Sequence, residues 1–261
     1  MWLDSHCHIS ADEFAQDRAA TLDRAEAAGV EAFVAIGSGY GIEHNARAVA
    51  LAQQDGRVWA AVGVHPHEAA ELDETLRAKL EAWISEPRVV AVGECGLDYH
   101  YMNSPRAVQR SVFAEQLALA RRHDKPVVLH VRGDEPNAFD EALELWRAAG
   151  GALEGVLHCY TGTLEFAKRA LDAGLLISFA GILTFKNDRG LRDTAKALPL
   201  DRLLVETDAP LLAPQGFRGR RNEPIHVGLV GEALAATHGI DVAEVARVTT
   251  HNARKFFRLD A

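Results

Sequence analysis

Eight short apolar runs alternate with longer amphipathic stretches along the chain, and this order constrains the fold more than any other feature. Each run is rich in Val, Ile, Leu or Ala and poor in charge, as expected for strands that are buried on both faces. Short strands that alternate with helices indicate βα units and a parallel sheet. The predicted strands are residues 2–8, 31–37, 58–65, 89–94, 126–131, 155–158, 175–179 and 203–206.

The stretches between these runs show helical periodicity, most clearly at 105–123, where apolar residues recur every three or four positions. Further helices are predicted at 11–29, 163–173 and 242–257. A length of 261 residues is normal for one α/β barrel. We therefore predict a (β/α)8 TIM barrel that forms a single domain over residues 1–261. A doubly wound open sheet is disfavoured, because no glycine-rich phosphate loop follows the first predicted strand.

The composition limits the partners of the chain. A net charge of −9 gives no broad basic surface for duplex DNA, so a nucleic-acid substrate would have to be gripped locally. The widely spaced Cys7, Cys95 and Cys159 predict buried packing residues of a cytoplasmic protein, not a disulfide framework. No signal peptide or membrane-spanning apolar run of about 20 residues is visible. We predict a monomer with no membrane association and no obligatory protein partner.

Ionisable residues gather where the predicted strands end. Six of the twelve histidines lie at such ends, together with one Glu and one Asp. In this fold the carboxyl ends of the strands form the active-site face, so residues far apart in sequence converge there. These strand-end residues are His6, His8, His65, His67, Glu94, His130, His158 and Asp208.

A metal site explains this pattern better than separate structural roles. A single strand-end histidine is more often a hydrogen-bonded structural residue, but burying so many ionisable groups together is costly unless they bind metal. His6 and His8 are two residues apart and share one face of their strand, with Cys7 on the other. We predict that the divalent-metal ligands are His6, His8, Glu94, His130, His158 and Asp208.

The number and kind of these ligands suit two divalent ions, with Mg, Mn or Zn as candidates. Glu94 is the natural bridging ligand. Asp208 is expected to bind one ion and to take the proton from a metal-activated water, which would make Asp208 and Glu94 the catalytic residues.

Eight motifs in sequence order resemble the TatD family of metal-dependent hydrolases, an amidohydrolase-like branch of TIM barrels, and together they span essentially the whole chain. They are DSHCH (4–8), GVHPHE (63–68), GECGLDYHY (93–101), KPVVLHVR (125–132), LHCYTG (157–162), ISFAGILTFKN (177–187), LLVETDAPLLAP (203–214) and RGRRNEP (218–224). The resemblance implies a dinuclear site with the same six ligands. It also implies deoxyribonuclease activity from 3′ ends (3′–5′ exonuclease type) on phosphodiesters. One departure is the loop after Arg132, where the local acidic residue is displaced to Asp134.

Further candidates would contact the substrate. His65 is predicted to contact the scissile phosphate or a metal-bound water, and the alternative is a residue that stabilises the turn at Pro66. Arg132, Lys186 and Arg220 are candidate phosphate-binding cations, although a solvated surface role is equally consistent with each alone. Asp98 and Tyr99 are expected to shape the loop over Glu94. Glu206 shares the face of Asp208 and is a candidate for supporting the metal ligands.

Two other functions remain open on the sequence alone. One is hydrolysis of a different ester or amide, such as an aminoacyl-tRNA ester or a small cyclic amide, because an acidic chain has no general attraction for long polyanions. The other is a non-catalytic metal-binding protein. The second is disfavoured, because every expected ligand and the expected base are present.

Overall fold

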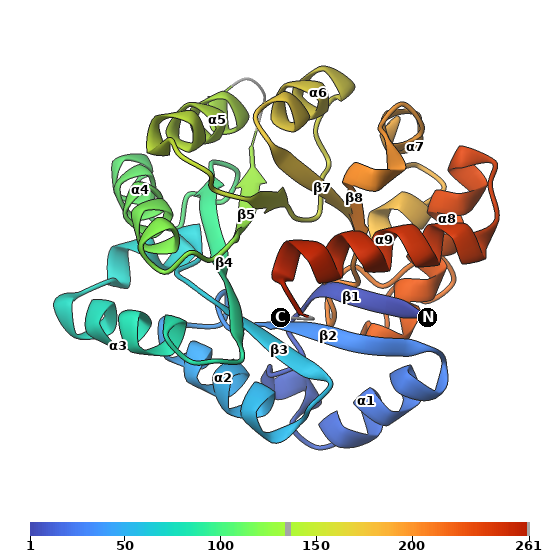
Figure 1. The fold of residues 1–261 in the computed structure, drawn as a ribbon, viewed down its shortest axis with the longest axis horizontal. Helices are drawn as coiled ribbons and strands as arrows, with labels where there is room; N and C mark the ends of the chain where they lie inside the picture. The colour runs from blue at the N-terminus through green and yellow to red at the C-terminus, as the bar shows by residue number, and fades with distance from the viewer. Residues whose placement is uncertain (134–136, 260–261) are drawn as a thin grey trace. The chain divides into compact units, whose positions relative to one another are not determined.

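The computed structural model describes residues 1–133 and 137–259 and shows eight strands in one sheet, in the order β1 to β8 (Figure 1). The pairings recorded between neighbouring strands are parallel, and β1 also contacts β8. The strands are β1 Trp2–Cys7, β2 Val30–Ile36, β3 Val58–Val62, β4 Val89–Asp98, β5 Val127–Arg132, β6 Gly155–Leu157, β7 Leu175–Phe179 and β8 Leu203–Val205.

Helices connect the strands, which confirms the predicted (β/α)8 barrel class. They are α1 Arg18–Ala27, α2 Asn45–Gln54, α3 Glu74–Ile84, α4 Arg106–Arg122, α5 Asn137–Ala149, α6 Leu164–Asp172, α7 Leu191–Lys196, α8 Val227–His238 and α9 Val242–Phe257. Short 3₁₀ helices are η1 Asp12–Phe14, η2 Ile42–His44, η3 Pro66–Glu71, η4 Gly181–Thr184, η5 Leu200–Arg202 and η6 Pro224–His226. Within residues 1–133 and 137–259, no helix is both long and apolar enough to cross a bilayer.

The prediction of one continuous helix over residues 11–29 is wrong. The segment forms η1, then a turn, and α1 begins only at Arg18, after the non-helical Asp17. The side chain of Arg18 explains the break, because its guanidinium donates to the backbone carbonyls of Ile9 and Ser10 at 2.8 and 3.0 Å. These bonds hold the preceding chain in a turn.

Two strands end elsewhere than predicted, and side chains from distant parts of the chain decide where β3 ends. Strand β3 ends at Val62, not at His65 as predicted, because the next two backbone N–H groups are taken by side chains. Gly63 N donates to Asn45 Oδ1 at 3.0 Å, and Val64 N donates to Gln116 Oε1 at 2.8 Å. Strand β4 runs to Asp98, beyond the predicted end, because its pairing with β5 continues to Arg132. The other predicted strand ends differ by one or two residues at most.

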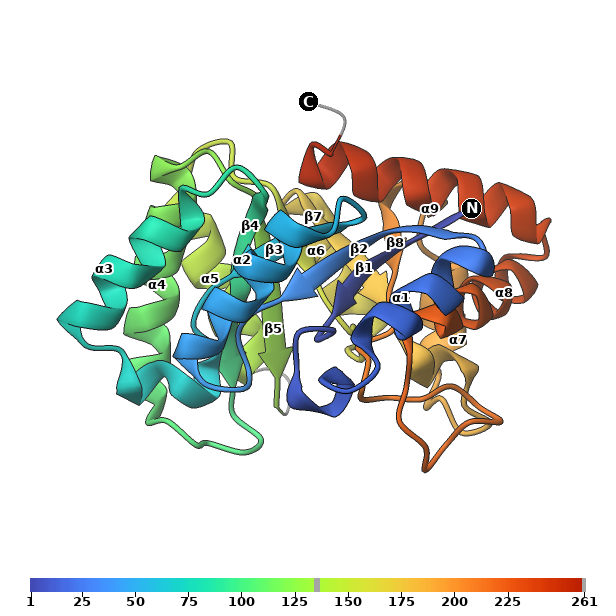
Figure 2. The same ribbon diagram turned by 90° about the horizontal axis from the view of Figure 1, so that it is seen from below.

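The described residues group into two compact units. The first comprises Met1–Ala35, His158–Asp172 and Leu176–Ala261, and the second comprises Ile36–Leu157 and Ala173–Leu175. Each unit has its own buried apolar side chains, such as Phe33 and Phe179 in the first and Phe113 and Leu117 in the second. In the second unit, helices α2 to α5 lie outside strands β3 to β5 (Figure 2). The prediction of one domain over residues 1–261 stays a prediction.

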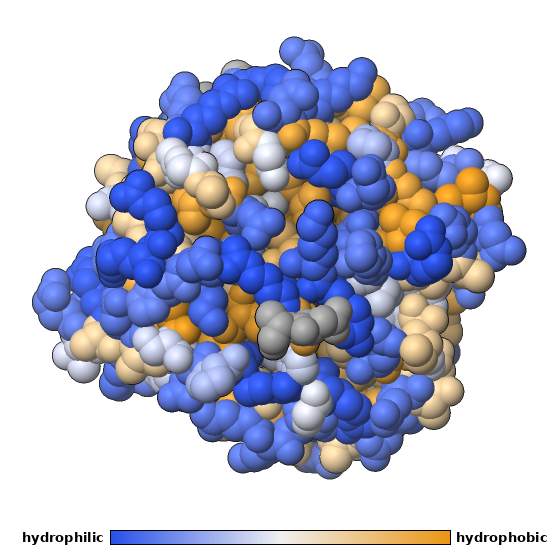
Figure 3. Space-filling model, viewed as in Figure 1, coloured by the Kyte–Doolittle hydropathy of each residue, from blue (hydrophilic) through white to orange (hydrophobic). Residues whose placement is uncertain are grey.

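The surface is mainly hydrophilic on the face that Figure 3 draws, with apolar side chains in small patches between polar ones. Such scattered apolar residues are normal for a protein surface. No extended apolar stripe is visible on the face that Figure 3 draws.

Gly231 in α8 supports a sharp stability prediction, because a methyl group there would lie 2.0 Å from Cη2 of Trp2. Alanine normally stabilises a helix interior by about 1 kcal/mol relative to glycine. Here we expect Gly231→Ala to lower the free energy of unfolding by about 1–3 kcal/mol, because overpacking forces the indole or the helix to shift. Urea unfolding measures this change.

Gly228→Ala in the same helix is the matched control. Its added methyl group would lie 3.3 Å from Nε1 of Trp2, so a much smaller change is expected. A Gly231→Ala protein as stable as the unsubstituted chain would contradict the packing described for Trp2.

Candidate metal centre

Four of the six predicted ligands come together in the first unit, around the carboxylate of Asp208. Asp208 Oδ1 lies 3.5 Å from Nε2 of His6 and 3.5 Å from Nε2 of His8. The rings of His6 and His158 stack, with centroids 3.9 Å apart. All four side chains are buried. We call His6, His8, His158 and Asp208, together with the adjacent Glu206, the first ligand cluster.

The donor set of this cluster fits a divalent cation. Ligand atoms of His6, His8 and Asp208 all lie within 4.8 Å of one another, and so do those of His6, His158 and Glu206. Imidazole nitrogens and carboxylate oxygens are ligands for Zn²⁺ and similar ions, and carboxylates also admit Mg²⁺. The coarse prediction of a divalent-metal site is therefore supported here.

The backbone around Asp208 is fixed by several hydrogen bonds. Asp208 N donates to the carbonyl of His6 at 2.9 Å. The buried carboxyl group of Asp4 accepts from Thr207 N at 2.9 Å and from Thr207 Oγ1 at 2.5 Å. Burial raises the pKa of Asp4 to about 8, although the bonds from Thr207 oppose this. Asn222 Nδ2 donates to the carbonyl of Thr207 at 2.8 Å. The turn that carries Asp208 is thus held from both sides.

Glu206 holds the imidazole of His158. Its Oε1 lies 3.2 Å from His158 Nδ1 and accepts from Cys159 N at 2.7 Å. A carboxylate beside Nδ1 favours the tautomer with the proton on Nδ1, which leaves Nε2 as the metal-binding nitrogen. The sequence prediction placed Glu206 on the face of Asp208, and the structure places it against His158 as well.

Two substitutions separate a supporting role of Glu206 from a direct one. Glu206→Ala is expected to weaken metal binding by about 10- to 100-fold, because His158 loses the acceptor that orients it. Glu206→Gln keeps an acceptor oxygen and is expected to weaken binding much less. Calorimetric titration of Mn²⁺ into the metal-free protein measures both, with thermal unfolding as the folding control. Equal losses in the two variants would show that Glu206 is itself a ligand.

The remaining two predicted ligands meet in the second unit. Glu94 Oε1 lies 2.8 Å from His130 Nδ1 and 3.6 Å from His65 Nε2. Ligand atoms of the three residues all lie within 4.8 Å of one another. We call His65, Glu94 and His130 the second ligand cluster. His65 also caps η3, because its Nδ1 accepts from His67 N at 3.1 Å, as expected for a residue that stabilises the turn at Pro66. Its contact with the scissile phosphate or a metal-bound water stays a prediction.

Close backbone packing positions the second ligand cluster. Glu94 N donates to Ser38 Oγ at 2.8 Å, which fixes the strand at this carboxylate. Two residues later, Gly96 pairs with His130, and a Cβ atom at Gly96 would lie 2.0 Å from the carbonyl oxygen of His130. Its φ of +147° also lies in the region that favours glycine. Only glycine lets β4 approach His130 so closely.

Asp98 connects the second ligand cluster to the loop after β4. Its Oδ2 lies 3.2 Å from His130 Nε2 and 2.9 Å from His67 Nε2. Its Oδ1 accepts from the backbone N–H groups of His100 and Tyr101 at 3.0 and 2.9 Å. Burial disfavours the charged carboxylate, but these hydrogen bonds hold the pKa of Asp98 well below its ordinary value. Asp98 therefore orients both histidines as well as shaping the loop.

The three predicted phosphate-binding cations, Arg132, Lys186 and Arg220, are exposed. Arg132 places its guanidinium 4.7 Å from the ring centroid of Tyr101. Lys186 follows η4, and Arg220 lies in the loop before η6. Their contacts with substrate stay predictions. Asp134, the acidic residue that departs from the family pattern in the loop after Arg132, lies outside the described residues.

The cysteines do not belong to the donor sets. Cys7 and Cys95 are completely buried, and burial raises the pKa of both thiols. Both therefore remain protonated packing residues, as predicted. The same prediction was only partly right for Cys159, which is half-buried. Its backbone turns there, with φ +44°, as its N–H donates to Glu206.

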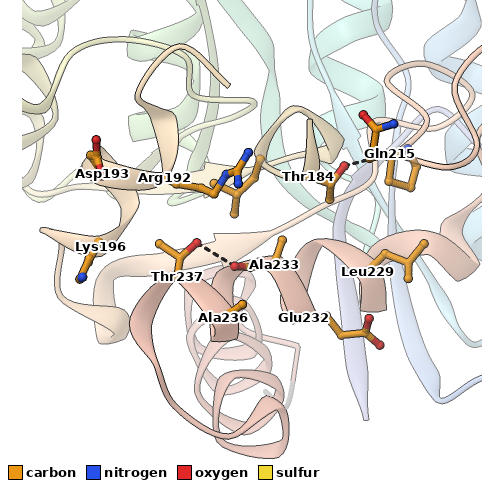
Figure 4. A pocket seen from close by; sticks show the side chains of 12 residues that line it. Thr184, Arg192, Asp193, Lys196, Gln215, Leu229, Glu232, Ala233, Ala236 and Thr237 are labelled. Carbon is orange, nitrogen blue, oxygen red and sulfur yellow. Dashed lines mark hydrogen bonds between the residues drawn. The ribbon is translucent and has the colours of Figure 1, made fainter. Parts of the chain in front are cut away.

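A separate pocket of about 500 Å³ lies in the first unit between α7, α8 and the loop after β8 (Figure 4). Its charged side chains are of both signs: Arg192 and Lys196 against Asp193 and Glu232. The hydroxyl of Thr184 accepts from Gln215 N there at 2.7 Å. None of the predicted ligands lines this pocket.

Comparison with known proteins shows the family of the chain. The family model described as "TatD related DNase" matches residues 3–258. The chain belongs to the TatD family of metal-dependent hydrolases. This TatD-family chain is 36% identical to the uncharacterized metal-dependent hydrolase YabD of Bacillus subtilis, over the full length of both. It is also 36% identical to a protein of Pantoea ananatis named 3′-5′ ssDNA/RNA exonuclease TatD, covering 98% of this chain and 99% of that protein.

Structural comparison supports the same assignment. The crystal structure of YJJV, a TatD homolog from Escherichia coli K12, superposes with a TM-score of 0.91 at 31% identity, covering 98% of each chain. The barrel fold and the hydrolytic class of this TatD-family enzyme are thus those that its strand-end residues predicted.

Proposed function

We propose that this TatD-family hydrolase is a divalent-metal-dependent 3′–5′ exonuclease that cleaves single-stranded nucleic acid, above all DNA. The observation that carries the proposal is the presence of two clusters of histidine and carboxylate donors, in which every residue but the half-buried His130 is buried. Relatives that are named 3′-5′ ssDNA/RNA exonucleases support the substrate class.

Each ligand cluster is proposed to hold one divalent ion. Such ions, when bound, stabilise negative charge on a phosphodiester and lower the pKa of water. Asp208 Oδ1, which lies 3.5 Å from two imidazole nitrogens, then accepts the proton of the attacking water. In the second ligand cluster, Glu94 and His130 would hold the other ion, and Asp98 contacts the imidazole of His130.

The substrate is proposed to be gripped by few residues. The net charge of −9 argues against a broad electrostatic footprint. His65 lies 3.6 Å from Glu94 in the second ligand cluster and is proposed to contact the scissile phosphate. Arg132, Lys186 and Arg220 are exposed and thus available to bind neighbouring phosphates.

The test is cleavage of 5′-labelled single-stranded DNA and RNA of one sequence, with Mg²⁺, Mn²⁺ or Zn²⁺ and with a chelator. A ladder that shortens one nucleotide at a time, and that chelation abolishes, is the expected result. A 5′-labelled strand with a blocked 3′ end should be resistant. Absence of cleavage with every metal, together with turnover of aminoacyl-tRNA or cyclic amides, would replace the nuclease by a different ester or amide hydrolase.

We also propose that the enzyme acts as a cytoplasmic monomer. The protonated, fully buried thiols of Cys7 and Cys95 suit a reducing compartment. Light scattering coupled to gel filtration is expected to give the mass of one chain, 28.4 kDa.

A further inference from the structure

An exposed aromatic side chain lies beside the second ligand cluster. Tyr101 is 54% exposed, and the neighbouring Met102 is 44% exposed. Both lie in the loop that follows β4, the strand that carries Glu94. Large apolar side chains that stay exposed next to a polar site are a common mark of a binding surface.

The ring of His100 meets the ring of Tyr101 edge to face, with centroids 4.7 Å apart. Tyr101 also has three further neighbours. Its backbone N–H donates to Asp98 Oδ1 at 2.9 Å. The ring of His67 meets it edge to face, with centroids 5.5 Å apart and planes at 89°. The guanidinium carbon of Arg132 lies 4.7 Å from the centroid of the Tyr101 ring. The exposed ring is therefore oriented before any ligand arrives.

The side chains of Tyr101 and Arg132 are of the kind that binds a nucleobase. Tyrosine rings and arginine guanidinium planes are the surfaces on which the bases of single strands stack. The guanidinium group of arginine can also bind a nearby phosphate. Stacking also supplies affinity that does not depend on a basic surface, which this acidic chain lacks.

We propose that Tyr101 and Arg132 form a nucleobase platform, which stacks on one of the two bases that flank the scissile phosphodiester. Asp98 joins this platform to the second ligand cluster, because the same carboxylate contacts Tyr101 N, His67 and His130. A base on the platform therefore places its own phosphodiester near Glu94 and His130. This inference rests on the proposed exonuclease function and names how that site recognises single strands.

The first test measures coupling between Tyr101 and the substrate base. Tyr101→Ala is expected to raise KM for a DNA oligonucleotide about tenfold, with a smaller change in kcat, because one stacked base is lost. Tyr101→Phe keeps the ring and should stay near the unsubstituted enzyme. With a stable abasic nucleotide at the contacted position, the difference between Tyr101→Ala and the unsubstituted enzyme should vanish. Ile240→Ala, which removes another exposed apolar side chain, is the control and should leave KM unchanged.

The second test does not need cleavage. In the Asp208→Asn protein with Mg²⁺, an oligonucleotide carrying 2-aminopurine beside the scissile bond should change its emission on binding. Adding Tyr101→Ala should remove that change. A Tyr101→Ala enzyme with normal KM overturns the platform, and so does a Tyr101→Ala penalty that persists with the abasic oligonucleotide. Emission that does not depend on Tyr101 overturns it as well. Failure of the unsubstituted enzyme to cut single strands would count against the proposed function, whereas the emission experiment still decides the platform.

Discussion

Asp208→Asn is expected to lower kcat about a thousandfold while the protein stays folded. The substitution keeps the volume of the side chain but removes the carboxylate that we propose as proton acceptor, and such groups contribute about 10²- to 10⁴-fold. Asparagine tolerates the left-handed backbone at this position, where φ is +56°, so no backbone strain is added. Steady-state kinetics at saturating Mn²⁺ measures the loss, and circular dichroism checks the fold.

The control for Asp208→Asn is Asp201→Asn, which changes an exposed acidic residue by the same chemistry. Its kcat should equal that of the unsubstituted enzyme. An Asp208→Asn enzyme that keeps more than a tenth of kcat with its full metal content would remove Asp208 from the role of base. Metal analysis of the same samples separates loss of the base from loss of the ion.

The alternation of apolar runs with helical stretches predicted the fold class, which is confirmed. Of the six predicted ligands, four lie together in the first unit and two in the second, and their role as ligands stays a prediction. This success has a physical basis, because buried strands give continuous apolar runs and residues two apart on a strand share one face. By that rule Asp98 would share the face of Glu94, and its carboxylate does contact His130, the partner of Glu94. The same period could have identified Asp98 as a site residue, but the prediction gave it only a role in the loop.

Other features depend on contacts that no local pattern carries. The end of β3 is set by Asn45 and Gln116, which lie 18 and 52 residues from the backbone groups that they bind. The helix predicted at 11–29 breaks because Arg18 binds carbonyls of the preceding turn. The approach of His67 to Asp98 likewise depends on η3, a turn that the sequence predicted only as the alternative role of His65. In each case a tertiary hydrogen bond overrides the local preference.

Glu94→Gln is expected to remove one metal ion per chain and to lower kcat by about a hundredfold or more. The carboxylate is almost fully buried and lies 2.8 Å from His130 Nδ1, so it is the negative partner of the second ligand cluster. A neutral amide of the same size keeps the packing but binds a divalent cation far less well. Metal analysis after dialysis, alongside kcat, gives both values, and Glu71→Gln on the exposed face of η3 should change neither.

The double variant Asp208→Asn with Glu94→Gln decides whether the two ligand clusters serve one reaction. Residues that act as a unit in catalysis are strongly non-additive, so the double variant should be no slower than the slower single variant. Independent roles would instead multiply the two losses. A multiplied loss, or a Glu94→Gln enzyme with full metal content and unchanged kcat, would contradict the predicted dinuclear centre. A non-additive loss would support the proposal that Glu94 and Asp208 serve the same active site.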